Sequence, residues 1–101
     1  MEFKKLQDAI LASWVRYQQE HNIKGQRAEH YVMKIGEEYG EFVQAYLRHV
    51  KFCKKNKVLP KKESQQRVAE ELSDVIGSAL ITADALGIDI EAALKRIWID
   101  K

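Results

Sequence analysis

Cysteine and proline are almost absent from this chain of 101 residues, which has one of each, Cys53 and Pro60. A single cysteine excludes an internal disulfide, so we expect a protein of a reducing compartment. Scarce proline leaves long stretches free to form helices, and the many Ala, Leu, Glu and Lys residues favour them. These absences predict an all-α protein without disulfides.

Long hydrophobic runs are also missing. No stretch approaches the roughly 20 apolar residues that cross a bilayer. The segment from Glu2 to Arg16 alternates polar and apolar residues, unlike a secretory signal. We therefore expect a soluble, cytoplasmic protein with no membrane partner. Its length predicts a single helical domain over residues 1–101, small enough that an oligomer sharing a core is expected.

Basic charge is concentrated in the middle of the chain. From Arg48 to Arg67 there are eight Lys or Arg residues and one acidic residue, whereas the rest of the chain is net acidic. A basic segment of this kind, here from Lys51 to Lys62, is typical of a solvated loop, although it can bind nucleic acid by counterion release. Because it has few aromatic residues and no recognition helix, we do not expect a nucleic-acid partner.

Apolar residues recur every three or four positions in four stretches, which predicts four helices. The first covers residues 2–21 and the second residues 28–53. The third begins near Ser64 as its N-cap and ends before Gly87, and Asp89 caps a short fourth helix. The second and third helices are the longest, and we expect them to pack antiparallel.

The packing faces of the two long helices follow from their apolar arcs. The arc of the second helix centres near Ile35, Tyr39 and Tyr46, and that of the third near Leu72 and Ala79. We expect these residues to be buried between the helices.

An acidic signature lies beside each arc. Glu38 and Glu41 are three residues apart on the second helix, as are Glu71 and Asp74 on the third. Residues at this spacing share a helix face, with Cβ atoms about 5–6 Å apart. One such pair is usually only a solvated face, but two pairs at matching edges of facing helices predict converging carboxylates. Four carboxylates suit Mg²⁺ and, through it, phosphates.

Other catalytic motifs are missing. There is no Gly-rich phosphate loop and no G-x-S-x-G turn. No histidine follows a glutamate by three residues, which excludes the di-iron pattern of helical bundles. Cys53 lies on an apolar stripe and is expected to be a core residue, not a nucleophile.

The acidic segments resemble the motifs of a known family. Residues 34–42 and 70–76 are similar to the E-E-x-x-E and E-x-x-D motifs of the MazG-like, all-α nucleoside triphosphate pyrophosphohydrolases, and the similarity extends over nearly the whole chain. It implies a four-helix MazG-like bundle completed by oligomerisation, as a dimer or tetramer. It also implies hydrolysis of an NTP or dNTP to the monophosphate and pyrophosphate, clearing unwanted nucleotides.

The resemblance also implies roles for the acidic residues. By motif position, Glu38, Glu41, Glu71 and Asp74 would be ligands of Mg²⁺, and sites of this kind often accept Mn²⁺ as well. Glu37 would lie beside the ligands or act as a helper base. Glu37 and Glu38 are therefore the expected catalytic residues.

Substrate contacts are expected from two parts of the chain. Lys34, Arg48, Lys51 or another subunit would contact the phosphates. Aromatic or amide residues of the first helix lie near the base in the family, which makes Gln7 and Trp14 the candidates here. Trp14 also lies on the apolar stripe of its helix, which favours a core position.

Two alternatives to this reading stay open. Within the same superfamily, phosphoribosyl-ATP pyrophosphohydrolase uses a similar pair of acidic helices. From a different class, the chain would be a non-catalytic helical module that binds nucleic acid through the basic segment from Lys51 to Lys62.

Overall fold

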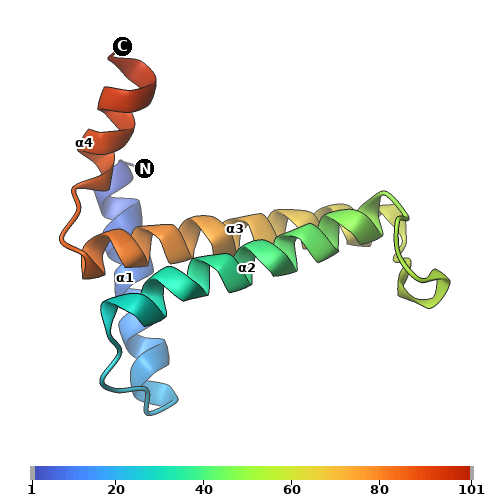
Figure 1. The fold of residues 1–101 in the computed structure, drawn as a ribbon, viewed down its shortest axis with the longest axis horizontal. Helices are drawn as coiled ribbons and strands as arrows, with labels where there is room; N and C mark the ends of the chain where they lie inside the picture. The colour runs from blue at the N-terminus through green and yellow to red at the C-terminus, as the bar shows by residue number, and fades with distance from the viewer. Residues whose placement is uncertain (1, 101) are drawn as a thin grey trace. The chain divides into compact units, whose positions relative to one another are not determined.

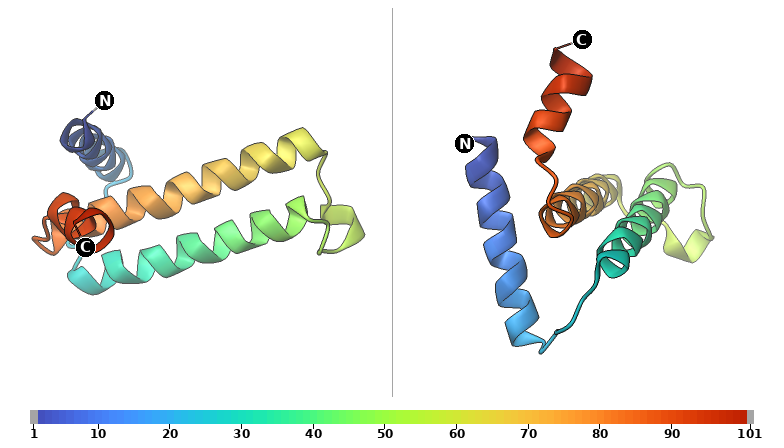
Figure 2. Two further views of the ribbon diagram at one scale, coloured as in Figure 1. Left: turned by 90° about the horizontal axis from the view of Figure 1, so that it is seen from above. Right: turned by 60° about the vertical axis from the view of Figure 1, so that its left-hand side comes forward.

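A computed structural model describes residues 2–100, and within this range the chain is all-helical with no β-strand (Figure 1). The α-helices are α1 (Phe3–Glu20), α2 (Ala28–His49), α3 (Lys61–Ala85) and α4 (Ile90–Leu94), with a 3-10 turn at Lys55–Lys57 and a π-helical turn at Lys95–Ile99. The predicted all-α class is confirmed, and the long helices α2 and α3 pack closely and run antiparallel (Figure 2). None of the described helices is long and apolar enough to cross a membrane.

The first three helices end in the same backbone turn. Beyond their last residues the chain adopts a positive φ, at Asn22 (53°), Lys51 (62°) and Gly87 (70°). The next amide then bonds back five residues, as in the 2.7 Å bond from Phe52 N–H to the Leu47 carbonyl oxygen. This is the Schellman pattern of helix ends. The predicted position of Gly87 just after the third helix is confirmed.

Two predicted helix boundaries are wrong. α2 ends at His49 and not near Cys53, because the left-handed residue after it turns the chain away. α3 begins at Lys61, three residues before the predicted N-cap, Ser64. Pro60 lies just before this helix, where its missing N–H costs nothing, and its carbonyl oxygen accepts the Ser64 N–H at 2.8 Å.

Ser64 is buried and links α3 to α2 instead of capping α3. Its hydroxyl donates to the Lys61 carbonyl oxygen at 2.9 Å, and His49 Nδ1 lies 2.8 Å from the same hydroxyl oxygen. Because the single hydroxyl hydrogen is already donated, His49 Nδ1–H is the donor in this second bond. The last turn of α2 is therefore tied to the first turn of α3.

The described residues form two compact units. The first contains the chain up to Val32 and from Ala79 onward, and in it the Gln7 side-chain amide donates to the Leu80 carbonyl oxygen at 3.4 Å. The second unit, Met33–Ser78, is the hairpin formed by most of α2, the connecting segment and most of α3. We call this second unit the hairpin unit.

The packed face of the hairpin unit is rotated from the predicted one. Tyr39 and Tyr46, two of the three residues predicted at the centre of the arc on α2, are 57% and 50% exposed, and Leu72 is 42% exposed. The third, Ile35, is half-buried. The least exposed positions form another row on each helix: Ile35, Glu38, Phe42 and Ala45 on α2, and Val68, Glu71, Val75 and Ser78 on α3. The predicted burial of the tyrosines is thus wrong for a single chain. Small residues such as Ala45 let the helices approach closely on this face, which brings a glutamate from each helix inside.

Candidate functional site

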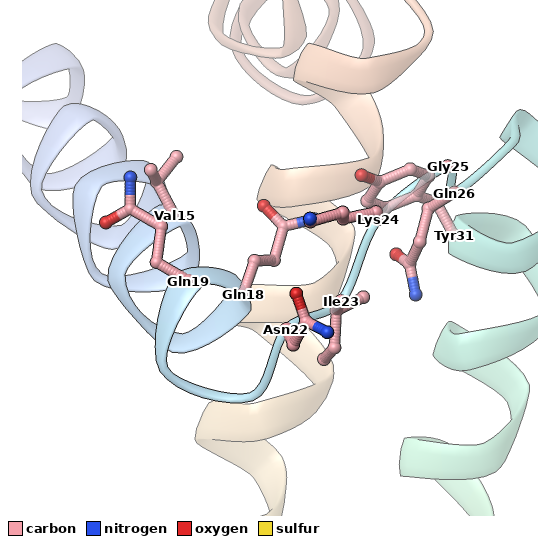
Figure 3. A pocket seen from close by; sticks show the side chains of 9 residues that line it. All are labelled: Val15, Gln18, Gln19, Asn22, Ile23, Lys24, Gly25, Gln26 and Tyr31. Carbon is pink, nitrogen blue, oxygen red and sulfur yellow. The ribbon is translucent and has the colours of Figure 1, made fainter.

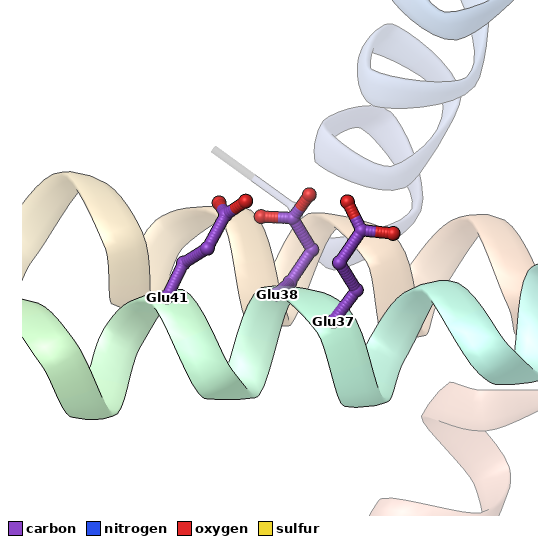
Figure 4. Close-up of side chains that lie close together, drawn as sticks. All are labelled: Glu37, Glu38 and Glu41. Atoms are coloured by element: carbon purple, nitrogen blue, oxygen red, sulfur yellow. The ribbon is translucent and has the colours of Figure 1, made fainter.

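Five acidic residues gather in the hairpin unit. Carboxylate oxygens of Glu37, Glu38 and Glu41 lie within 4.8 Å of one another, and so do those of Glu38, Glu71 and Asp74. The three carboxylates on α2 point to the same side of the helix (Figure 4). Glu38 belongs to both groups. The structure therefore brings together all four predicted metal ligands and Glu37.

Glu38 and Glu71 are the two buried members of this cluster, 8% and 6% exposed. Lys34 Nζ lies 3.1 Å from Glu38 Oε1, and Arg67 Nη2 lies 3.3 Å from Glu71 Oε1. The other oxygen of each carboxylate, Oε2, is buried and has no hydrogen-bond partner among the described residues. A buried carboxylate oxygen without a partner is costly, since nothing replaces the water it has lost. A bound cation would remove this cost.

Two carboxylates of the cluster, Glu41 and Asp74, have raised pKa values. The Glu38 carboxylate is the largest of several influences that raise the pKa of Glu41 above its ordinary value, followed by desolvation and Glu71. Burial is the main cause that raises the pKa of Asp74, with Glu38 adding to it and Arg67 opposing it. The cluster thus carries more negative charge than its own cations balance, which favours a divalent cation.

Lys34 is engaged with the carboxylates. Its ammonium lies 3.1 Å from Glu37 Oε1 as well as from Glu38 Oε1. Burial acts against the charged form, but the hydrogen bonds to Glu38 and Glu37 outweigh it and raise the pKa of Lys34. The phosphate contact expected of this residue stays a prediction.

The other predicted substrate residues lie in both units. Arg48 is seven residues after Glu41, so it lies on the same face of α2, about 10 Å further along the helix axis. Gln7 belongs to the first unit, where its amide donor is directed to a backbone carbonyl. Trp14, in the same unit, stacks on Tyr17 with 5.7 Å between ring centroids, and its Nε1 is buried without a hydrogen-bond partner among the described residues. Their contacts with substrate stay predictions.

A pocket in the first unit was not predicted from the sequence (Figure 3). It has a volume of about 640 Å³ and is lined by Val15, Gln18, Gln19, Asn22, Ile23, Lys24, Gly25, Gln26 and Tyr31. Four of these side chains are amides, and none of them hydrogen bonds to another described residue. Amides carry a donor and an acceptor, as the edge of a nucleobase does. Four amides within nine residues were visible in the sequence, but they form no motif.

Comparison with known proteins connects this geometry to a family. Residues 3–98 match the family described as phosphoribosyl-ATP pyrophosphohydrolase. No curated protein and no solved structure matches the chain. The predicted resemblance is confirmed in its broader part, a related all-α pyrophosphohydrolase family, while the match itself is to the alternative and not to MazG. The enzymes of this family are hydrolases that act on acid anhydrides. Because the match covers nearly the whole chain, this protein belongs to the phosphoribosyl-ATP pyrophosphohydrolase family.

Proposed function

We propose that this protein is a Mg²⁺-dependent pyrophosphohydrolase that releases pyrophosphate from phosphoribosyl-ATP. The observation that carries the proposal is the pair of buried glutamates, Glu38 and Glu71, each with an unpartnered oxygen, in a chain of this family. The family match favours phosphoribosyl-ATP over the NTP or dNTP substrates that the sequence placed first. These stay the second candidate, because the same carboxylates suit any triphosphate.

The donor set fits Mg²⁺, or Mn²⁺ in its place. Hard cations prefer carboxylate oxygens, and the cluster offers only these. Glu38, Glu41, Glu71 and Asp74 would hold the metal, and the orphaned oxygens of the two buried glutamates would gain a partner. A bound ion would neutralise phosphate oxygens and lower the pKa of a bound water.

Glu37 is the residue that we propose as the helper base. Its side chain is 60% exposed, and Lys34 holds it beside the buried Glu38. A water oxygen forms a bond to the α-phosphorus of the triphosphate. The bond from this phosphorus to the oxygen that bridges it to the β-phosphorus breaks, and the electron pair leaves on pyrophosphate. The water proton passes to the Glu37 carboxylate and then to solvent. Substrate and water thus give phosphoribosyl-AMP and pyrophosphate without a protein nucleophile.

The amide-lined pocket supports a substrate that contains a heterocyclic base. Its amides can pair with a base edge, and the Tyr31 ring can stack on a base. We expect Gln18→Ala to raise KM about fivefold to tenfold, the effect of one lost hydrogen bond, with little change in kcat. Gln65→Ala, an exposed amide on α3, is the matched control. Equal KM values for the two variants would contradict this role.

The deciding experiment measures pyrophosphate release from phosphoribosyl-ATP and from a panel of NTPs and dNTPs, with Mg²⁺ and with EDTA. We expect EDTA-sensitive release and a monophosphate product. Glu38→Gln should lower kcat/KM at least about 100-fold, because metal stabilisation of the reacting phosphate is worth several kcal/mol. Glu63→Gln, an exposed glutamate early in α3, should not. Turnover that persists in EDTA or in Glu38→Gln would refute the proposal.

A further inference from the structure

The two halves of the carboxylate cluster follow one residue pattern. Residues 34–45 read KIGEEYGEFVQA, and residues 67–78 read RVAEELSDVIGS. In both, a cation comes first, acidic residues stand at the fourth, fifth and eighth positions, and a small residue stands at the twelfth. One segment lies on α2 and the other on α3, both in the hairpin unit. The cluster is therefore built from two similar halves.

The contacts of the two halves match as well. Lys34 reaches Glu38 at 3.1 Å and Arg67 reaches Glu71 at 3.3 Å, each over a spacing of four residues. In both pairs the cation is about half-exposed and the carboxylate is buried, with side-chain exposures of 48% and 11%, and of 53% and 8%. Each cation also lies near the adjacent, exposed glutamate, Glu37 or Glu70.

Each cation holds only one oxygen of its buried carboxylate. The held atom is Oε1 in both Glu38 and Glu71, and the unpartnered buried atom is Oε2 in both. A carboxylate with one oxygen held cannot rotate freely about its last torsion, so the direction of the second oxygen is set as well. The same division of the two oxygens occurs on both helices.

We propose that Lys34 and Arg67 are positioning residues, each of which holds one carboxylate oxygen so that the other is presented to a divalent cation. This inference rests on the proposed metal site and gives Lys34 a role other than the expected phosphate contact. Charge alone predicts the opposite effect, because a positive side chain repels a divalent cation and its removal tightens binding. Positioning predicts that removal weakens binding, so the sign of the change distinguishes the two.

The test measures Mg²⁺ binding to the full chain by calorimetry, without substrate. Lys34→Met and Arg67→Met should each weaken binding about 10–100-fold, the range for residues that orient metal ligands. Lys34→Arg should recover most of the affinity, since it keeps a charged donor. Lys4→Met is the matched control, because Lys4 pairs with Asp8 at the same spacing, at 3.3 Å, on the exposed surface of α1. It should leave Mg²⁺ binding unchanged.

The possible outcomes separate this inference from the proposed function. Equal or tighter binding by the methionine variants overturns the positioning role while leaving the metal site intact. A wild-type protein that does not bind Mg²⁺ overturns the metal site and this inference with it. If a methionine variant does not fold in EDTA, Lys34→Gln and Arg67→Gln replace it, with the same expected loss. In a Glu38→Gln background, Lys34→Met should add no further loss, because both act through one carboxylate.

Discussion

Glu38 shows how a single residue joins the two halves of the site. Among the described residues it is the one carboxylate that belongs to both groups whose oxygens lie within 4.8 Å of one another, and it is also buried. In an ordinary helix pair this position would be apolar, since burying a charge with an unsatisfied oxygen reduces stability. The helices accept this cost at two positions, Glu38 and Glu71, which supports the metal-binding role that we propose for them.

The raised pKa values of Glu41 and Asp74 predict how pH affects the metal-free protein. When a folded-state pKa lies above the unfolded one, the folded state binds more protons between the two values. The free energy of unfolding therefore falls as pH rises from the ordinary carboxyl range, about 4, through the raised folded values. Replacing both residues, in Glu41→Gln/Asp74→Asn, removes this loss.

Melting temperatures in EDTA between pH 4 and 7 test this prediction. The difference in Tm between the double variant and the wild type should grow in favour of the variant as pH rises. Glu63→Gln, whose side chain lies on the exposed surface, should show no such trend. Added Mg²⁺ at pH 7 should raise the Tm of the wild type but not that of the double variant. A Tm difference that stays constant with pH would contradict the prediction.

At the scale of elements, the ends of the two long helices differ in the residue that adopts the left-handed conformation. Gly87 occupies the left-handed position after α3, whereas Lys51 occupies it after α2. A side chain at positive φ costs about 1 kcal/mol or more, a cost that glycine avoids. We expect Lys51→Gly to raise the free energy of unfolding by about 0.5–1 kcal/mol, which corresponds to a Tm increase of a few degrees.

The reverse change at Gly87 provides the comparison. Gly87→Ala should lower stability by about 1 kcal/mol from backbone strain alone, because no atom lies within 4 Å of the added Cβ. Lys54→Gly, at a φ of −58°, should not stabilise the protein. Urea unfolding of the three variants measures these differences. Stabilisation by Lys54→Gly equal to that by Lys51→Gly would show that the left-handed conformation is not the cause.

The whole chain leaves much apolar surface exposed for its size. Among the described residues only three apolar residues are buried, at 4–5% exposure: Ala45, Leu80 and Ala83. In the hairpin unit, an apolar row of Tyr39, Tyr46, Leu72 and Ile76 stays between 42% and 57% exposed. A core this small supports little stability, and exposed apolar rows usually mark interfaces. We therefore propose that a second copy of the chain covers this row, in a dimer or a tetramer.

Tyr46→Glu tests the proposed interface. A charge in the middle of the apolar row would have to be buried unpaired, so the oligomer should dissociate to monomers at micromolar concentration. Gln44→Glu, an exposed position on the same helix, should keep the oligomer intact. Light scattering after size exclusion gives the mass of each form. A wild type that is already monomeric would refute the proposal.

The basic segment from Lys51 to Lys62 connects the two long helices. It follows the left-handed end of α2 and forms a 3-10 turn at Lys55–Lys57, before Pro60 and the start of α3 at Lys61. That this segment binds no nucleic acid stays a prediction. The charge can attract an anionic substrate toward an acidic site.

The features that depend on spacing along one helix could be predicted from the sequence alone. The 3.6-residue period sets the helices, and residues three apart share a face, so the acidic pairs with Glu38 and Glu71 were predictable. Gly87 was predictable for a similar reason, because its left-handed conformation is a local property.

Which side of each long helix is buried depends on how the helices pack, and spacing along one helix does not give it. Hydrophobicity pointed to the arc with Tyr39 and Tyr46, but the helices meet about 60–70° away, on the face with Glu38. The unpartnered buried oxygens of Glu38 and Glu71 and the amide pocket were equally hidden. Each depends on the relative placement of atoms from separate turns or elements, and the packing energy that sets this placement is shared over many residues at once.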